Sequence, residues 1–346
     1  MKALMKTKPG HGNVEIVDIP EPVPGEGLVK IRVVYSGICA TDLHSYEGLY
    51  AGTKPPVVLG HEFSGVVAET GPGVASLKPG DRVTSETTFT ICGKCVFCKR
   101  EEYNLCSNRT GIGSQVNGSF AEYMLAREQS VHKLPDSVSL LSAALTEPLA
   151  CCVHGCLERT SISNGDVVLI MGPGPIGFLA GMVAASQGAV VILSGVSADE
   201  ERLRTAIKLG IHRAVNQQEE DLAQVAREMT DGLGPSPVIE CSGSVKALNM
   251  ALQLAAKQAD IVQMGLFAQQ YNEIDTGAFF PKELRLVGSR TQKPSSWRTS
   301  IKLMEEGAVT PENLVTGVIP LEKWQDGFQE IRDRHGIKTV FQLSRE

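Results

Sequence analysis

Residues 167–177 read Val167-Val168-Leu169-Ile170-Met171-Gly172-Pro173-Gly174-Pro175-Ile176-Gly177, and this stretch decides the fold of the chain. An apolar run typical of a buried strand is followed by a Gly-x-Gly-x-x-Gly turn and then by a predicted helix over residues 175–187. In that context the turn is a dinucleotide-binding fingerprint. Gly172 permits the tight turn, Gly174 lets the backbone approach a pyrophosphate, and Gly177 allows close helix packing. The helix N-terminus, beginning at Pro175 and Ile176, offers free N–H groups and a positive dipole end to the anion.

Strands and helices continue to alternate beyond this motif. Strands are predicted at residues 190–193, 238–240 and 260–264, and helices at 200–209 and 245–257. The strand at 190–193 is apolar throughout, as expected where helices cover both faces. The pattern predicts an α/β fold with a doubly wound parallel sheet. Gly265, which follows the strand at 260–264, is a further candidate for cofactor contact.

The end of the strand at 190–193 bears on the choice between NAD and NADP. An Asp or Glu would be expected there to bind the ribose 2′-hydroxyl, but the chain has Gly195, with Ser197 and Arg202 nearby. Loss of the carboxylate removes the repulsion of a 2′-phosphate. Asp199 could still reach the ribose, so the sequence leaves both NAD and NADP open.

The segments on either side of this region differ from it. Residues 1 to about 90 carry short β-type runs, at 28–35, 57–59, 64–68 and 81–84, between Gly/Pro-rich turns. The C-terminal part contains an amphipathic helix at 321–334 and a closing strand at 338–343. We expect a β-rich domain over 1–150, a dinucleotide-binding domain over 151–288, and a return to the first domain over 289–346.

Composition excludes several classes of protein. The chain has 346 residues, 42% hydrophobic and 21% charged, which is typical of a globular protein. No apolar run is long enough for a membrane span, and the N-terminal residues show no secretory signal. A net charge of −6 without basic blocks argues against nucleic acid as a partner. We expect a cytoplasmic protein that acts on small molecules.

Four of the nine cysteines lie close together, as Cys92-x2-Cys95-x2-Cys98-x7-Cys106. One loop can wrap four such thiolates tetrahedrally around Zn²⁺ and leave no open position. The sequence therefore predicts a structural zinc site in a lobe at about residues 90–110.

A second set of metal-ligand residues is dispersed along the chain. Cys39 follows one predicted strand, His61-Glu62 follow another, and Glu147 precedes the dinucleotide-binding domain. One thiolate, one imidazole and one or two carboxylates suit a catalytic zinc that keeps a position for substrate.

Several motifs together resemble the zinc-dependent medium-chain dehydrogenase/reductase family over nearly the whole chain. They are Gly60-His61-Glu62-x2-Gly65-x5-Gly71-x2-Val74, Gly80-Asp81-Arg82-Val83, Gly37-Ile38-Cys39-Ala40-Thr41-Asp42-Leu43-His44 and Glu147-Pro148-Leu149. The last two are similar to the branch of sorbitol (polyol) and threonine dehydrogenases. The resemblance implies a GroES-like catalytic domain, a Rossmann domain, two zinc ions per subunit and a homotetramer.

The resemblance also implies residue roles. Cys39, His61 and Glu62 match catalytic zinc ligands, and Glu147 matches a further ligand or a partner of the bound water; the two glutamates can exchange roles. Thr41 matches the hydroxyl that binds the substrate oxygen, His44 a histidine that passes the proton onward through the cofactor ribose, and Asp42 a residue that orients this loop. Arg290 matches an arginine at the substrate cleft of polyol dehydrogenases.

The sequence therefore predicts a zinc-dependent polyol dehydrogenase that forms a ketose with NAD or NADP. The alternatives are an L-threonine 3-dehydrogenase, a simple secondary-alcohol dehydrogenase and a polyol-phosphate dehydrogenase. A non-catalytic zinc- and nucleotide-binding regulator is disfavoured, because it predicts loss of Cys39, His61 or Thr41, and all three are present.

Overall fold

A computed structural model describes residues 1–345. The chain divides into two compact units within this range. The first contains Met1–Glu147, Lys293–Glu306 and the chain from Thr310 onward, and the second contains Pro148–Gln292 and Gly307–Val309. No helix in the described part of the chain is long and apolar enough to cross a membrane.

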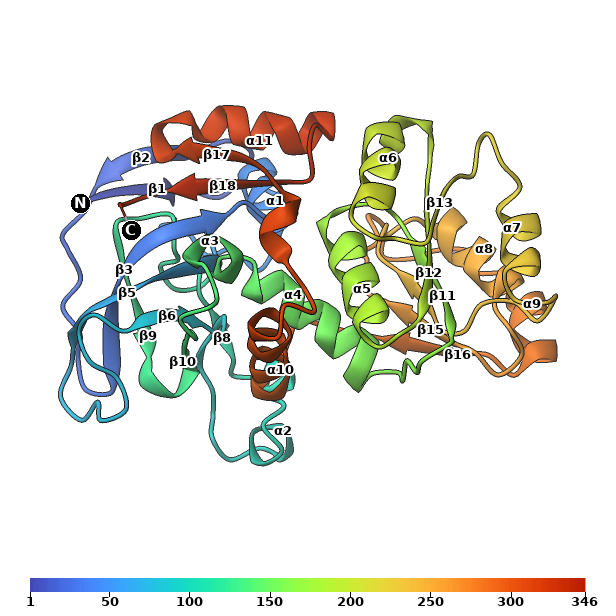
Figure 1. Ribbon diagram of the computed structural model, residues 1–346. Helices are drawn as coiled ribbons and strands as arrows, with labels where there is room; N and C mark the ends of the chain where they lie inside the picture. The colour runs from blue at the N-terminus through green and yellow to red at the C-terminus, as the bar shows by residue number, and fades with distance from the viewer. Residues whose placement is uncertain (346) are drawn as a thin grey trace. The chain divides into compact units, whose positions relative to one another are not determined.

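The second unit holds a parallel sheet of order β13-β12-β11-β14-β15-β16. In this order β12 and β13 lie on one side of β11, and β14, β15 and β16 lie on the other. The order confirms the predicted doubly wound sheet. Helices α5 and α6 cover one face, and α7, α8 and α9 cover the other (Figure 1). The strands are β11 (Val167–Met171), β12 (Val190–Gly195), β13 (Arg213–Asn216), β14 (Val238–Glu240), β15 (Asp260–Gln263) and β16 (Arg285–Gly288).

Three helices of this unit fall close to the predicted positions, with one difference in length, and two others, at residues 222–228 and 276–279, were not predicted. They are α5 (Pro175–Ser186), α6 (Glu200–Lys208), α7 (Leu222–Glu228), α8 (Val245–Leu254) and α9 (Thr276–Phe279). The helix predicted to reach residue 257 ends at Leu254. There the Lys282 ammonium donates to the carbonyls of Leu252 (3.3 Å) and Ala255 (2.9 Å), which satisfies acceptors that a longer helix would have bonded internally.

The first unit is rich in β-structure, as the sequence predicts. Its main sheet has the order β10-β6-β5-β3-β18-β17, with β9 also paired to β3, beside smaller sheets β2-β1-β4 and β7-β8. The strands are β1 (Lys2–Lys6), β2 (Val14–Asp18), β3 (Leu28–Gly37), β4 (Val57–Val58), β5 (Glu62–Thr70), β6 (Arg82–Ser85), β7 (Thr88–Thr90), β8 (Thr110–Gly111), β9 (Tyr123–Arg127), β10 (Val131–Lys133), β17 (Val315–Pro320) and β18 (Lys338–Gln342).

The C-terminal part of the chain completes this sheet. Strand β18 pairs antiparallel with β3 and parallel with β17. Helix α11 (Trp324–Asp333) lies over β17 and β18 (Figure 1), and Trp324 and Phe328 are buried in the same core cluster as Phe341. The other helices of note are α1 (Ala40–Glu47), α2 (Val96–Lys99), α3 (Leu140–Ala143), α4 (Thr146–Val153) and α10 (Pro294–Glu305).

Candidate functional site

The dispersed metal-ligand residues meet where β3 ends and β5 begins. These strands pair antiparallel with Gly37 opposite Glu62, so the residues just after β3 and just before β5 share one edge of the sheet. Cys39 caps α1 there, and its Sγ accepts the N–H of Thr41 (3.5 Å). One ligand atom from each of Cys39, His61 and Glu62 lies within 4.8 Å of the others. Strand β5 starts at Glu62, two residues before the predicted start, and this places the carboxylate in the ladder.

Asp42 joins the two segments that carry these ligands. Its Oδ2 accepts the N–H of Cys39 (2.9 Å), and its Oδ1 accepts the N–H of Gly60 (3.2 Å). The same Oδ1 lies 3.7 Å from His61 Nδ1. Because Asp42 is buried and bonded to both segments, it fixes the separation of Cys39 and His61. These contacts fit the orienting role expected for Asp42.

Lys338, which the sequence analysis did not single out, completes the surroundings of Glu62. It lies on β18, and its buried Nζ forms an ion pair with Glu62 Oε2 and donates to the carbonyl of Ile38 (2.8 Å). Gly37 leaves room for this pair, since a Cβ there would lie 2.5 Å from Glu62 Oε2. The available signal was a lysine at the start of the predicted closing strand.

The electrostatics of the cluster favour a bound cation. Burial opposes a charged imidazole, but the Asp42 carboxylate, with Cys39 and Glu147, raises the pKa of His61 well above its usual range. Burial raises the pKa of Asp42. The acidic side chains of Asp42, Cys39 and Glu147 thus all act on the His61 imidazole. A thiolate, an imidazole and a carboxylate are the donor set that zinc prefers, so the residues fit a zinc ion.

Thr41, His44 and Glu147 lie around this cluster in different settings. The Thr41 hydroxyl is 3.6 Å from Cys39 Sγ. His44, one turn further along α1, is 48% exposed, with its Nδ1 3.6 Å from Glu47 Oε2. Glu147 is buried near the start of α4, outside the group of mutually close ligand atoms, although its charge acts on His61. The structure thus separates a ligand group from a surrounding polar group.

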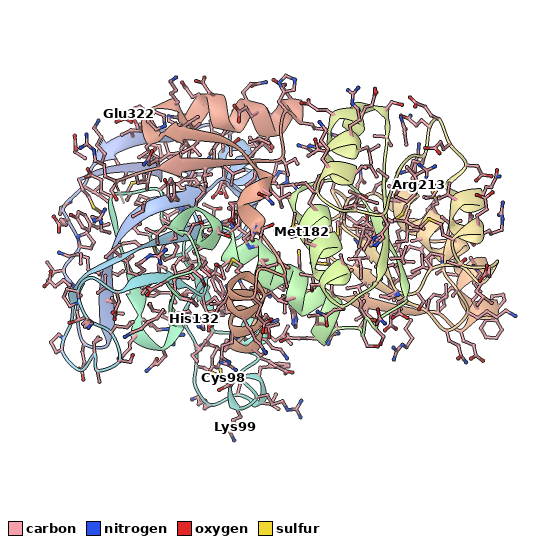
Figure 2. All side chains as sticks on the ribbon, viewed as in Figure 1. Cys98, Lys99, His132, Met182, Arg213 and Glu322 are labelled. Atoms are coloured by element: carbon pink, nitrogen blue, oxygen red, sulfur yellow. The ribbon has the colours of Figure 1, made fainter. Side chains whose placement is uncertain are left out.

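The four cysteines of the lobe form a second compact cluster. The Sγ atoms of Cys92, Cys95, Cys98 and Cys106 all lie within 4.8 Å of one another. Cys92 Sγ is 3.9 Å and Cys95 Sγ 3.5 Å from Cys98 Sγ. Tetrahedral zinc with Zn–S bonds of about 2.3 Å requires sulfur atoms about 3.8 Å apart, so the geometry fits zinc. Helix α2, with Cys98 and Lys99, lies in this lobe (Figure 2).

The thiols in the lobe respond differently to their surroundings. Backbone N–H groups of Lys94 and Cys95 lower the pKa of Cys92 to about 6, whereas burial and the neighbouring sulfurs raise the pKa of Cys98 to about 12. Without a cation, four thiolates this close would repel one another. A divalent metal removes that conflict, because it binds thiolates directly.

The glycine turn has the conformation expected of a phosphate-binding loop. Gly172 has φ of 102°, and a Cβ on Gly177 would lie 1.9 Å from the Gly172 carbonyl oxygen. A Cβ on Gly174 would stand in open space, so the backbone at Gly174 is accessible to a ligand. Pro175 starts α5 at its first turn, followed by Ile176. Gly265, in the loop after β15, packs closely on the loop after β14, because a Cβ on Gly265 would lie 2.2 Å from Gly243 N.

The end of β12 offers no carboxylate to a ribose. A Cβ on Gly195 would lie 2.8 Å from Pro173 Cγ, so a side chain there conflicts with the glycine turn. Asp199 is buried and accepts the N–H of Val196 (3.2 Å). Ser197 instead bonds the uncharged side chains of Asn216 (3.0 Å) and Gln218 (2.9 Å), while Arg202 lies half-buried at the start of α6.

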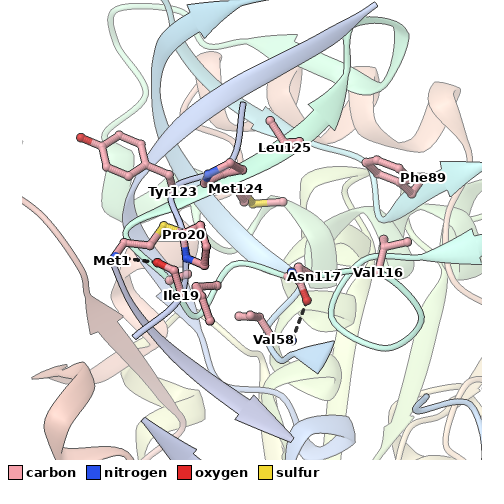
Figure 3. A pocket seen from close by; sticks show the side chains of 13 residues that line it. Met1, Ile19, Pro20, Val58, Phe89, Val116, Asn117, Tyr123, Met124 and Leu125 are labelled. Carbon is pink, nitrogen blue, oxygen red and sulfur yellow. Dashed lines mark hydrogen bonds between the residues drawn. The ribbon is translucent and has the colours of Figure 1, made fainter. Parts of the chain in front are cut away.

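Neither Arg290 nor the lining of an apolar pocket belongs to the two metal clusters. Arg290 is exposed two residues after β16, in the second unit. The first unit contains an apolar pocket of about 220 Å³ lined by residues such as Ile19, Phe89 and Met124 (Figure 3). The pocket lining includes none of the candidate ligands, so it is distinct from both metal clusters.

Comparisons with known proteins agree with this geometry. Residues 25–136 match the alcohol dehydrogenase GroES-like domain, and residues 175–306 match the zinc-binding dehydrogenase domain. A sorbitol dehydrogenase of Halalkalibacterium halodurans is 46% identical over 98% of both chains. A D-arabitol-phosphate dehydrogenase of Enterococcus avium is 44% identical over 100% of this chain and 98% of its own. A zinc-binding dehydrogenase structure from Sinorhizobium meliloti, bound to NADP, has a TM-score of 0.91 and 31% identity over 98% of both chains.

Proposed function

Because the chain belongs to the zinc-dependent medium-chain dehydrogenase family, we propose that it interconverts a secondary hydroxyl of a polyol and the ketone of a ketose, with NAD or NADP. The observation that carries this proposal is the cluster of Cys39, His61 and Glu62 beside the Thr41 hydroxyl. A ligand set next to a hydroxyl that can hold the substrate oxygen is what alcohol oxidation requires.

We assign Cys39, His61 and Glu62 as the ligands of the catalytic zinc. Glu147, which lies outside the close group, is the partner of the water or substrate at the remaining position. The bound zinc would supply Lewis acidity that lowers the pKa of the alcohol, and the nicotinamide would accept the hydride. Cys92, Cys95, Cys98 and Cys106 hold the structural zinc.

The protein's own residues position the substrate and move its proton. The Thr41 hydroxyl is placed to accept the proton of the substrate hydroxyl, and His44, on the same helix, to pass a proton onward. Because His44 is exposed, it can pass the proton to solvent. Asp42 and Lys338 hold the ligand-bearing segments in place through buried bonds. Preorganised polar groups of this kind reduce the reorganisation needed during reaction.

We propose that the first unit is the catalytic domain, containing the lobe at about residues 90–110, and that the second is the cofactor domain. Gly172, Gly174, Pro175, Ile176, Gly177, Gly195, Ser197, Arg202 and Gly265 would contact the dinucleotide. We also propose a homotetramer in the cytoplasm. The outer edge of β16 has no partner strand among the described residues, and Leu286 on it is 41% exposed, which supports assembly through this strand.

The substrate proposal has two forms. A free sugar alcohol is supported by similarity to the sorbitol dehydrogenase, and a polyol phosphate by similarity to the D-arabitol-phosphate dehydrogenase. We propose Arg290 as a substrate residue, because a guanidinium can bind several hydroxyls or a phosphate through two parallel hydrogen bonds.

The test is absorbance at 340 nm with zinc-loaded protein and either NAD⁺ or NADP⁺. The panel contains sorbitol, xylitol, galactitol, ribitol, D-arabitol 1-phosphate, butane-2,3-diol and threonine. Reduction of the cofactor with a polyol or its phosphate is the expected result. Turnover of threonine alone would identify a threonine dehydrogenase, and turnover of the simple diol alone would identify a secondary-alcohol dehydrogenase. No turnover with any substrate would contradict the proposed activity.

A further inference from the structure

Glu240 is a buried carboxylate at the carboxyl end of β14, and its hydrogen-bond partners are all uncharged. It has no solvent exposure. Its Oε1 accepts the N–H of Ser242 (2.8 Å) and the Ser242 hydroxyl. Its Oε2 accepts the N–H of Gly243 (3.0 Å) and the side-chain amide of Gln263 (2.6 Å). Over residues 1–345, no basic side chain forms an ion pair with Glu240.

The hydrogen bonds to Glu240 are those that a carboxylate accepts. Four donors point at its two oxygens, and three of them, the N–H groups of Ser242 and Gly243 and the Gln263 amide, cannot accept a hydrogen bond in return. The Ser242 hydroxyl accepts the N–H of Ser244 (3.1 Å), which leaves its own proton for Glu240. Buried charges in proteins are normally paired with an opposite charge. Glu240 is therefore a buried negative charge that lacks a counter-ion within the protein.

The position of Glu240 in the sheet indicates which ligand could supply that charge. In a sheet of this order, the ligand lies outside the carboxyl ends of the strands, at the point where the order reverses between β11 and β14. Strands β14 to β16 form the second mononucleotide-binding half. Glu240 lies at the start of the first loop of that half. This loop packs closely on its neighbours, because a Cβ on Gly172 would lie 2.8 Å from Ser242 Cβ and a Cβ on Gly265 would lie 2.8 Å from Glu240 Oε2.

We infer that the Glu240 carboxylate sets the relative affinity of this site for oxidised and reduced cofactor. The inference rests on the proposed function, because it requires a nicotinamide dinucleotide. The nicotinamide ring is cationic in the oxidised form and neutral in the reduced form, so a nearby negative charge stabilises the oxidised form selectively. Glu240 is thus a positioning residue whose charge also biases the binding equilibrium toward the oxidised cofactor.

The experiment measures dissociation constants of NADP⁺ and NADPH, and of NAD⁺ and NADH, by calorimetry on zinc-loaded protein without substrate. Glu240→Gln removes the charge and should weaken the oxidised form relative to the reduced form by about threefold to tenfold, the scale of one unit charge that acts on the ring from a distance and not in direct contact. Glu240→Asp keeps the charge but shortens the side chain. It should weaken both forms alike and leave their ratio unchanged.

Two further variants separate charge from structure. Asp260→Asn removes another buried carboxylate, paired with Arg285 (2.7 Å) at the amino end of β15, and should leave the ratio unchanged. Gln263→Lys keeps Glu240 and supplies a counter-ion, so it should shift the ratio in the same direction as Glu240→Gln. This variant decides the question if Glu240→Gln does not fold.

The outcomes distinguish the two levels of the proposal. Equal weakening of both cofactor forms by Glu240→Gln, an equal shift from Asp260→Asn, or no shift from Gln263→Lys would overturn the role of the charge. Failure of the unmodified protein to bind any of the four cofactors would instead overturn the proposed function.

Discussion

Lys338, on the last strand of the chain, forms a buried ion pair with Glu62, the first residue of β5 and a neighbour of His61. Burial opposes a charged ammonium here, but the neighbouring Glu62 carboxylate, with Cys39 and Asp42, raises the pKa of Lys338 above its usual value. The ammonium also donates to the carbonyl of Ile38, next to Cys39. One side chain from the C-terminal segment therefore connects both segments that carry candidate zinc ligands.

Replacement of this lysine should affect the metal-free protein most. In Lys338→Met, Glu62 becomes a buried charge without a partner, and the free energy of unfolding should fall by about 3–5 kcal/mol. Added zinc gives the Glu62 carboxylate a new cationic partner and should recover a large part of this loss. Chemical denaturation with and without zinc measures both effects.

Two control variants make this prediction specific. Lys338→Met with Glu62→Gln removes both charges and should be more stable without zinc than Lys338→Met alone. Lys338→Arg keeps the charge and should stay closer to the unmodified protein. Equal instability of the single and double variants would show that the lysine stabilises by packing and not by charge.

The two zinc sites should be separable by mutation. We expect two zinc ions per chain in the purified protein. Cys39→Ser should leave one zinc, a folded chain and no dehydrogenase activity. Cys95→Ser should also leave one zinc, but should lower the melting temperature, because a closed Cys₄ site stabilises its own loop.

Metal content by mass spectrometry and melting curves test this assignment. Unfolding of Cys39→Ser, with little change in Cys95→Ser, would show that the structural and catalytic assignments are reversed. Loss of both metals in either variant would show that the two sites depend on each other.

The features that the sequence predicted well are those encoded locally. The glycine turn and the Cys₄ lobe are each contained within a short stretch, so spacing alone indicates their geometry. Strand β13, helix α7 and strand β16 were not predicted, because each is short and carries charged residues that obscure its apolar pattern. The exposed residues of β16 give no sign of a strand at the edge of a sheet.

The features that sequence could not supply depend on long-range pairing. Cys39 and Glu62 were candidates from their motifs, but their meeting depends on the register of β3 and β5. Lys338 reaches them only because β18 pairs with β3. Glu240 looks like an ordinary strand residue until its donors from β15 and the following loop are seen.

The Thr41 hydroxyl should be required for turnover. Thr41→Val should lower kcat at least about 100-fold, the lower range for a group that transfers a proton in the transition state. Thr41→Ser keeps the hydroxyl and should retain most activity. Ser45→Ala, on the same helix, is the matched control, because the Ser45 hydroxyl bonds Thr41 O (2.8 Å) and Thr53.

Replacement of His44 should give a milder and reversible defect. His44→Gln should lower kcat, and imidazole buffer should restore part of it, since the exposed position is accessible to a small base. Steady-state rates at several imidazole concentrations provide the measurement. A rate that does not respond to imidazole would place His44 outside the proton path.

Cofactor choice should depend on the contact between Gly195 and Pro173. The unmodified protein has no carboxylate at the end of β12, so we expect it to reduce both NAD⁺ and NADP⁺. Gly195→Asp would introduce a charge that repels a 2′-phosphate, but its Cβ would lie 2.8 Å from Pro173 Cγ and disturb the phosphate-binding turn. The single variant should therefore lose activity with both cofactors.

Removal of the proline ring should rescue this variant for one cofactor only. Pro173→Ala with Gly195→Asp removes the Cγ atom and lets the carboxylate reach the ribose hydroxyls. The ratio of kcat/KM for NAD⁺ to that for NADP⁺ should then rise about 100-fold, from a new hydrogen bond and the repulsion of the phosphate. Pro173→Ala alone should leave the ratio near that of the unmodified protein. An unchanged ratio in the double variant would show that other residues determine the preference between NAD⁺ and NADP⁺. Ser197, Asn216 and Arg202 would then be the next residues to replace.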